Sequence, residues 1–348
     1  MKNRTSYFLL LPLLFLVVYT SEAQLGGRSG YSFVGLPVSA RLAAIGGVNV
    51  SVMDKDVSMG YANPALWADS THHQVSMTYQ PFYSDIKRST LFVNHSLKDN
   101  KGNIGVGINY LSYGKMDQTD ATGNNQGQFR ASDYSLLVGY ANRQGPFYMG
   151  VNAKFMHSQL ESYGASAVAL DLGGVYKHPT QQLTVGLTMK NIGIRLSDYM
   201  PGDPVKLPFE VQVGATYKPE HMPLRLSLTF QQLQNWNLVY NDPSYNVILN
   251  LDGTKTPKET TFGDQFLRHM VVGGEFILAK SIHFRFGYNF LARRELRIDA
   301  KSGGAGLSWG FMIRAKKFDF GFSRAYYHIA GGTSYFTLAI NVEEWRKK

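Results

Sequence analysis

The chain has no cysteine among its 348 residues, which excludes disulfide bonds, thiolate metal ligands and a lipid-modified cysteine. Charged residues are also scarce, at 17% of the total, whereas glycine, tyrosine and phenylalanine are abundant. A composition of this kind favours strands and tight turns over solvated helices. We therefore expect an all-β protein.

Long apolar runs are missing after residue 23, so we expect no helix that crosses a membrane. The first 23 residues differ, because Lys2 and Arg4 precede an apolar stretch at residues 7–19 and a small-residue site ends at Ala23. This pattern is typical of a secretory signal peptide. An exported chain without disulfides must take its stability from its size or from a membrane.

Segments of alternating polarity recur from residue 73 onward. In residues 224–230, leucine or phenylalanine fills every even position, and arginine, serine or threonine fills every odd position. A period of two places the apolar and polar side chains on opposite faces of a strand. Fourteen strands are predicted, at residues 73–83, 88–97, 102–113, 128–142, 147–158, 165–177, 183–192, 209–218, 224–233, 269–279, 282–291, 305–315, 318–326 and 333–343.

The connections between these strands alternate between short and long, except for the short first one. Outer-membrane barrels have short periplasmic turns and longer extracellular loops, whereas a soluble β-sandwich, the alternative fold, has no reason to alternate. The predicted fold class is an all-β, 14-stranded antiparallel transmembrane β-barrel with a short N-terminal helical plug. We expect it in a Gram-negative outer membrane, with both termini in the periplasm.

The segment between the signal peptide and the first strand, residues 24–71, is too short to form its own core. Ser39 and Gly46 are placed to begin and end a short helix, and Asn63 and Pro64 are placed to begin another. A 14-stranded barrel is wider than its own side chains fill, so this segment is predicted to plug the lumen. The alternative is a loose periplasmic arm. The predicted division is a signal peptide at 1–23, a plug at 24–71 and a barrel at 72–348.

Residues 36–70 carry a recognisable pattern. A small-residue segment at residues 40–47 is followed by an acidic stretch at 54–56 and by the plug motif Asn63, Pro64 and Ala65. This pattern resembles the N-terminal signature of the outer-membrane barrel family that includes the FadL-type fatty acid transporters and the PorV and PorQ proteins of the Bacteroidetes type IX secretion system. The opening of the pattern is most similar to the PorQ branch.

The resemblance implies a non-enzymatic anchor in the type IX attachment complex. Its partner would be a PorZ-like surface protein, and through that protein the PorU/PorV sortase complex, which attaches cargo to lipopolysaccharide. Two alternatives stay open. One is a FadL-like transporter of hydrophobic small molecules, and the other is a PorV-like shuttle that carries many cargo proteins.

The sequence contains no nucleophile elbow, no zinc-binding helix motif and no phosphate-binding loop. No Ser/His/Asp or paired-carboxylate set could be assembled either. We therefore predict no catalytic residue, no cofactor, no metal and no nucleic-acid partner. His72 and His73 are adjacent, and we expect their side chains to point to opposite faces of the first strand and to share no metal.

Two surface regions are candidates for binding. The long loop at about residues 233–266 holds Trp236, Tyr240 and Tyr245, which we expect either to dock a partner or to pack as a lid over the barrel. A second loop holds three arginines that could contact lipopolysaccharide phosphate or outer-membrane lipid, or could simply keep the membrane edge solvated. These arginines are Arg293, Arg294 and Arg297.

Overall fold

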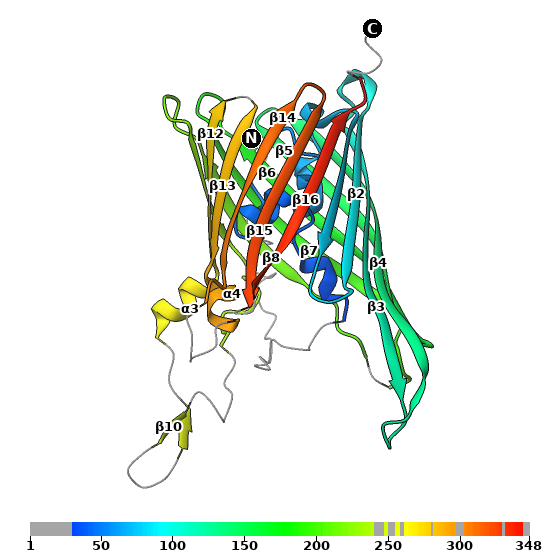
Figure 1. The fold of residues 1–348 in the computed structure, drawn as a ribbon. Helices are drawn as coiled ribbons and strands as arrows, with labels where there is room; N and C mark the ends of the chain where they lie inside the picture. The colour runs from blue at the N-terminus through cyan, green and yellow to red at the C-terminus, as the bar shows by residue number, and fades with distance from the viewer. Residues whose placement is uncertain are drawn as a thin grey trace, which may run out of the picture.

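The computed structural model describes residues 30–202, 204–239, 247–249, 255–257, 261–279, 281–296, 303–328 and 331–343. Within these residues, fourteen antiparallel strands form one closed barrel (Figure 1). They are β1 (Gln74–Pro81), β2 (Lys87–Ser96), β3 (Asn103–Thr119), β4 (Asn125–Gln144), β5 (Phe147–Leu160), β6 (Tyr163–Lys177), β7 (Leu183–Ser197), β8 (Glu210–Tyr217), β9 (Leu224–Phe230), β12 (Met270–Ala279), β13 (Ile282–Asn289), β14 (Leu307–Ala315), β15 (Phe318–His328) and β16 (Gly331–Asn341). The first strand pairs with both β2 and β16, which closes the ring. The predicted fold class is therefore confirmed.

The strands present a mainly apolar face to the outside and a mainly polar or small face to the lumen, where a few large apolar side chains such as Phe92 and Leu137 pack against the plug. In β9, Leu226 is 45% exposed, whereas Ser227 and Thr229 are buried. In β3, Ile104 and Val106 are likewise exposed on the outer face. A closed sheet pairs its backbone groups without leaving an edge, as the hydrocarbon core of a bilayer requires, and its apolar outer band suits the lipid. These features define a transmembrane β-barrel.

In the part of the chain that the structure covers, no helix is long and apolar enough to cross a bilayer. The helices are instead short. Those before β1 are η2 (Ser32–Gly35), α1 (Ala40–Ala44), α2 (Met59–Ala62), η3 (Pro64–Leu66) and η4 (Asp69–Thr71). The later ones are η5 (Lys98–Asn100), α3 (Phe262–Arg268) and α4 (Phe290–Glu295). A separate hairpin pairs β10 (Val247–Leu249) with β11 (Lys255–Pro257).

The barrel has two different rims. The connections β2–β3, β4–β5, β6–β7, β8–β9 and β14–β15 are short and lie at one rim, here called the turn rim, where β16 also ends. The opposite rim, here called the loop rim, carries α3, α4 and the β10–β11 hairpin (Figure 1). The predicted alternation of short and long connections holds for β7–β8, β9–β12 and β13–β14, which are longer than the short turn-rim connections, but not for β3–β4, β5–β6 or β15–β16. The placement of the turn rim in the periplasm stays a prediction.

Three predicted long loops are shorter than expected, because the strands beside them run further. The strands β3 and β4 continue pairing out to Thr119 and Asn125, and β5 and β6 are joined by residues 161–162 alone. No residue of β3 after Leu111, and none of β4 before Ala131, is buried. Both faces of this hairpin are therefore solvent-facing, which removes the polarity alternation that marks a strand in the sequence.

Both predicted helix starts before β1 are present. The Ser39 hydroxyl accepts a hydrogen bond from the Leu42 amide at the start of α1, and Gly46 follows that helix with φ of 98°. The Asn63 side chain caps η3, with Pro64 at its first position. The blue helices of Figure 1 lie inside the barrel. The boundaries of the three predicted segments stay predictions, since the signal peptide lies outside the described residues.

Candidate functional site at the plug and the barrel wall

A network of buried charges joins the N-terminal segment to the barrel wall. We call residues 30–71 the plug. Arg41, on α1 of the plug, donates from Nε to Glu275 Oε1 on β12 at 2.8 Å and from Nη2 to Asp54 Oδ2 at 3.0 Å. From the wall, Arg225 on β9 and Arg285 on β13 also bind Glu275, at 2.6 Å and 2.9 Å. Only 2% of the Glu275 side chain and 4% of the Arg41 side chain are exposed.

The network sets three guanidinium groups against the carboxylates of Glu275 and Asp54, with a third carboxylate, that of Asp56, 4.0 Å from Arg41 Nη1, so each charge depends on the others. Burial alone would raise the pKa of Asp54, but the neighbouring guanidinium groups of Arg41 and Arg225 hold that pKa well below its usual range. Removing one partner from a buried ion pair commonly costs about 3–5 kcal/mol, because an uncompensated charge is left behind. The network therefore fixes α1 against β9, β12 and β13. Sequence reasoning did not identify Arg41, although a lone arginine in a run of small residues was a signal.

The predicted plug motif lies against another part of the wall, at β5, β6 and β7. The Asn63 side chain is fully buried, and its Oδ1 accepts from the Ala65 amide at 3.0 Å. Its Nδ2 donates to Val50 O at 2.8 Å, and Gly174 O and Leu187 O of the wall each lie 3.3 Å from it. One amide thus caps η3 and at the same time ties the plug to β6 and β7. The motif is structural in this geometry.

Two wall glycines make room for the motif. A Cβ added at Gly150 of β5 would lie 2.5 Å from the carbonyl carbon of Pro64, and one at Gly173 of β6 would overlap the Asn63 side chain. Contacts this short are not tolerated between backbone and Cβ atoms. Only glycine at these two positions allows the backbone of the plug to approach the strands.

A second buried pair stands beside the motif. Lys154 Nζ on β5 lies 2.8 Å from Asp171 Oδ1 on β6, and both side chains are fully buried. The same ammonium group donates to Asn191 Oδ1 and lies 5.5 Å from the ring centroid of Tyr61 in the plug. These polar groups bind one another inside the lumen, next to an apolar cluster in which Trp67 of the plug packs with Phe92 and Leu137 of the wall.

Two pockets remain between the plug and the wall near the loop rim. One, of about 170 Å³, is lined by Gly46, Gln231 and Asn289 among others. The other, of about 140 Å³, is lined by Tyr61, Lys190 and Gln212 among others. Typical pockets for small-molecule ligands occupy roughly 300–1,000 Å³ and are mostly apolar. Both pockets are smaller than that range.

The candidate docking loop is described only in part. Tyr240 and Tyr245 lie outside the described residues. Trp236 is 48% exposed, and its ring stacks on His269 with centroids 5.2 Å apart and contacts Phe262 of α3. This tryptophan belongs to an ordered aromatic cluster at the loop rim. Its role in docking stays a prediction.

The three candidate arginines are also described only in part. Arg297 lies outside the described residues. Arg293 and Arg294 lie on α4, where Arg294 pairs with Asp264 of α3 at 2.8 Å and Arg293 donates to Gly303 O. These contacts hold α3, α4 and the following loop together. Contact with lipopolysaccharide stays a prediction for all three.

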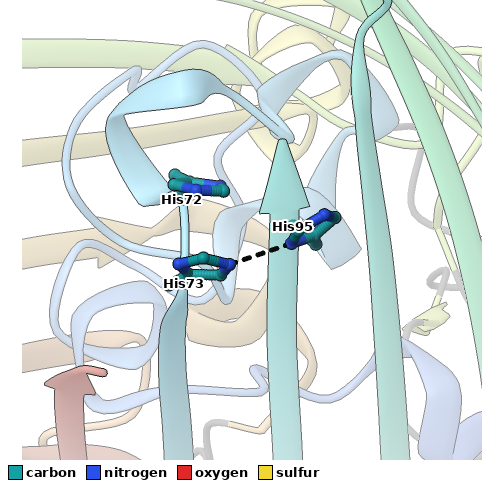
Figure 2. Close-up of side chains that lie close together, drawn as sticks. All are labelled: His72, His73 and His95. Carbon is teal, nitrogen blue, oxygen red and sulfur yellow. Dashed lines mark hydrogen bonds between the residues drawn. The ribbon is translucent and has the colours of Figure 1, made fainter. Parts of the chain in front are cut away.

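The expectation that His72 and His73 point to opposite faces is wrong. His73 precedes β1 and has a left-handed backbone with φ of 55°, which breaks the alternation of an extended strand. As a result, the two rings stack with centroids 3.7 Å apart. Figure 2 shows His95 of β2 beside them, with its Nδ1 atom 3.0 Å from His73 Nε2. The geometric reason for predicting no shared metal is thereby removed.

The closed sheet, its apolar outer band and its polar, plugged lumen define an outer-membrane β-barrel protein. No protein-family model matches the chain, and no curated protein matches it. The solved structures similar to it include the TodX monoaromatic hydrocarbon channel deltaS2 mutant, with a TM-score of 0.49, 10% identity, and coverage of 86% of this chain and 96% of that chain. They also include the KdgM porin, with a TM-score of 0.33, 7% identity and coverage of 77% and 98%.

A third similar structure is the Salmonella typhi outer membrane phospholipase dimer with bound calcium, with a TM-score of 0.29 and 9% identity. The match covers 80% of this chain and 96% of that one. The similar structures thus include both channels and an enzyme. Likenesses at this level carry no argument about function, which has to come from the residues of this chain.

Proposed function

We propose that this outer-membrane barrel is a non-enzymatic anchor that holds a partner protein at the cell surface. The observation that carries the proposal is the buried pairing of Arg41 in the plug with Glu275 in the wall. Moving the plug aside would separate these charges within the lumen, at a cost of several kcal/mol. A lumen held shut in this way suits a structural role better than solute conduction.

A projecting hairpin supplies a surface for the partner. Residues 112–130 of β3 and β4 stay paired beyond the point where the strands last carry a buried side chain. Eight residues of extended strand reach about 25 Å at ~3.3 Å each. At the tip, Asp120 Oδ1 accepts from the Thr122 and Asn124 amides, both at 2.9 Å, so the turn is ordered. We call this feature the β3–β4 extension.

The resemblance of residues 36–70 to the PorQ branch gives the partner a proposed identity. The partner would be a PorZ-like surface protein, which in turn works with the PorU/PorV sortase complex and lipopolysaccharide. The β3–β4 extension lies at the loop rim, and Trp236 and α4 lie at the same rim. With the turn rim and both termini in the periplasm, these features would all face the cell exterior.

The test is co-purification of the full chain from outer membranes with its bound proteins. Wild type should retain one surface protein in stoichiometric amount. A variant in which a two-residue turn replaces residues 116–128 should lose this surface protein. The variant should still show the heat-dependent change in gel mobility that marks a folded barrel. The anchor role is wrong if wild type retains no such protein. Retention of the partner by the shortened variant would place the contact elsewhere on the loop rim.

A FadL-like transporter of hydrophobic molecules is the second candidate. The pockets of about 170 Å³ and 140 Å³ beside the plug are smaller than typical ligand pockets, but they lie where a ligand would enter from the loop rim, and this position favours transport. Native mass spectrometry of the detergent-purified chain discriminates the two functions. A co-purified fatty acid would support transport, and a set of many cargo proteins would support a PorV-like shuttle.

A further inference from the structure

Three histidines meet on the outer surface of the barrel at the turn rim. His72 and His73 come directly before β1, and His95 lies near the end of β2. Each can offer one ring nitrogen such that the three nitrogens lie within 4.8 Å of one another. His95 is exposed and shares the outward face of β2 with Leu91. We call His72, His73 and His95 the histidine cluster.

A carboxylate lies against the cluster. Glu343 Oε1, just beyond β16, is 3.2 Å from His73 Nδ1 and 3.4 Å from His72 Nε2. If His73 carries its proton on Nδ1 and donates it to Glu343, the Nε2 atom of the same ring has a free lone pair. This Nε2 atom faces His95 Nδ1 at 3.0 Å. A carboxylate that holds one ring nitrogen and so directs the other outward is the usual outer partner of a metal-binding histidine.

The hydrogen bonds of His72 bear on metal binding, because imidazole binds a metal through a ring nitrogen that carries no proton. The His72 Nδ1 atom accepts from the Ser96 amide at 2.8 Å, so His72 would exchange this hydrogen bond for the metal by turning its ring.

We propose that the histidine cluster binds a divalent transition metal of the zinc class at the turn rim. His72, His73 and His95 supply the nitrogen ligands, and Glu343 is the carboxylate that orients His73 or completes the fourth position. Three imidazoles and one oxygen form a set that Zn²⁺ takes in tetrahedral geometry, whereas Mg²⁺ and Ca²⁺ prefer oxygen ligands.

The position of the site gives the metal a structural consequence. The His73 amide donates to Asn94 O at 2.9 Å, and the Val342 amide donates to His73 O at 3.0 Å. The backbone of His73 therefore bridges β2 and the end of β16, which is where the first and last strands close the barrel. A metal held by His73, His95 and Glu343 would link all three chain segments at this closure.

The experiment uses the full mature chain without a polyhistidine tag, purified in detergent and stripped with a chelator. Isothermal titration with Zn²⁺ should give one site per chain, and Co²⁺ should give the absorption bands of tetrahedral coordination. His95→Gln and His73→Gln should each weaken Zn²⁺ binding by more than about tenfold, and Glu343→Gln by roughly 10–100-fold. Zn²⁺ should also raise the temperature at which the folded gel band of wild type is lost.

His221→Gln is the matched control, because His221 is exposed at the same rim in the β8–β9 turn. This variant should bind Zn²⁺ as wild type does. Heat-modifiable gel mobility shows that each variant is folded. Equal binding by the His95→Gln and His221→Gln variants would overturn the proposal. So would a wild-type chain that binds no Zn²⁺ and whose melting temperature responds only to pH.

Discussion

Arg41 and Glu275 are 234 positions apart in the sequence, yet Arg41 Nε donates to Glu275 Oε1 at 2.8 Å in a site closed to solvent. One residue belongs to the plug and the other to the wall. Their contact links plug and wall through a shared acceptor, because Glu275 also accepts from Arg225 and Arg285. The closed lumen depends on this link.

Glu275→Gln should weaken the barrel more than an ordinary surface change. The substitution leaves three guanidinium groups facing only Asp54 and the more distant Asp56, which lies 4.0 Å from Arg41, at an expected cost of about 3–5 kcal/mol in the free energy of unfolding. Urea titration followed by gel mobility measures this change. Glu220→Gln removes the same charge from an exposed turn and should stay within about 0.5 kcal/mol of wild type. Equal effects of the two variants would show that the network does not hold the plug.

The contribution of Asp54 to the free energy of unfolding should be lost on acidification and should not change at higher pH. Since Arg41 and Arg225 hold its folded-state pKa below the ordinary value of about 3.9, its stabilising effect is complete above that value and is lost as the pH falls further. The difference in unfolding free energy between wild type and Asp54→Asn should therefore be constant from pH 5 to 8 and shrink below pH 4. A difference that grows on acidification would contradict the ion pairing.

Two neighbouring glycines of β6 offer a matched pair of substitutions. A Cβ at Gly173 would overlap the Asn63 side chain, whereas one at Gly174 has only Tyr148 O nearby, at 4.0 Å. Gly173→Ala should displace the plug and lower the free energy of unfolding by about 1–3 kcal/mol, the usual cost of overpacking. Gly174→Ala should be nearly neutral. Limited proteolysis of residues 30–71 reports the displacement, and equal protection in both variants would argue against a tight fit.

Much of the barrel could be predicted because each strand carries its own signal. The alternation in β9 needs no knowledge of the other strands, since lipid and lumen select opposite residue types on its two faces. The caps at Ser39 and Asn63 are equally local. The β3–β4 extension was missed, because a strand exposed on both faces shows no alternation.

The contacts that matter most to the site were not local. The pairing of Arg41 with Glu275 depends on how the plug turns inside the closed ring, which no sequence period reports. The histidine cluster was missed for a different reason. A left-handed backbone at His73, which is not glycine, defeats the rule that adjacent residues point apart.

A disulfide between the plug and the wall tests most directly whether the plug stays in the lumen while the protein functions. A Cβ at Gly321 of β15 would lie 3.4 Å from the Ala40 Cβ of α1, close to the ~3.5–4.5 Å of native disulfides. Ala40→Cys/Gly321→Cys should form the disulfide with dissolved oxygen as the oxidant and no added catalyst, leave no thiol to label, and retain the surface partner at the wild-type level. Thiols that stay free would show that the plug lies elsewhere, and a cross-linked chain that loses its function would show that the plug must move.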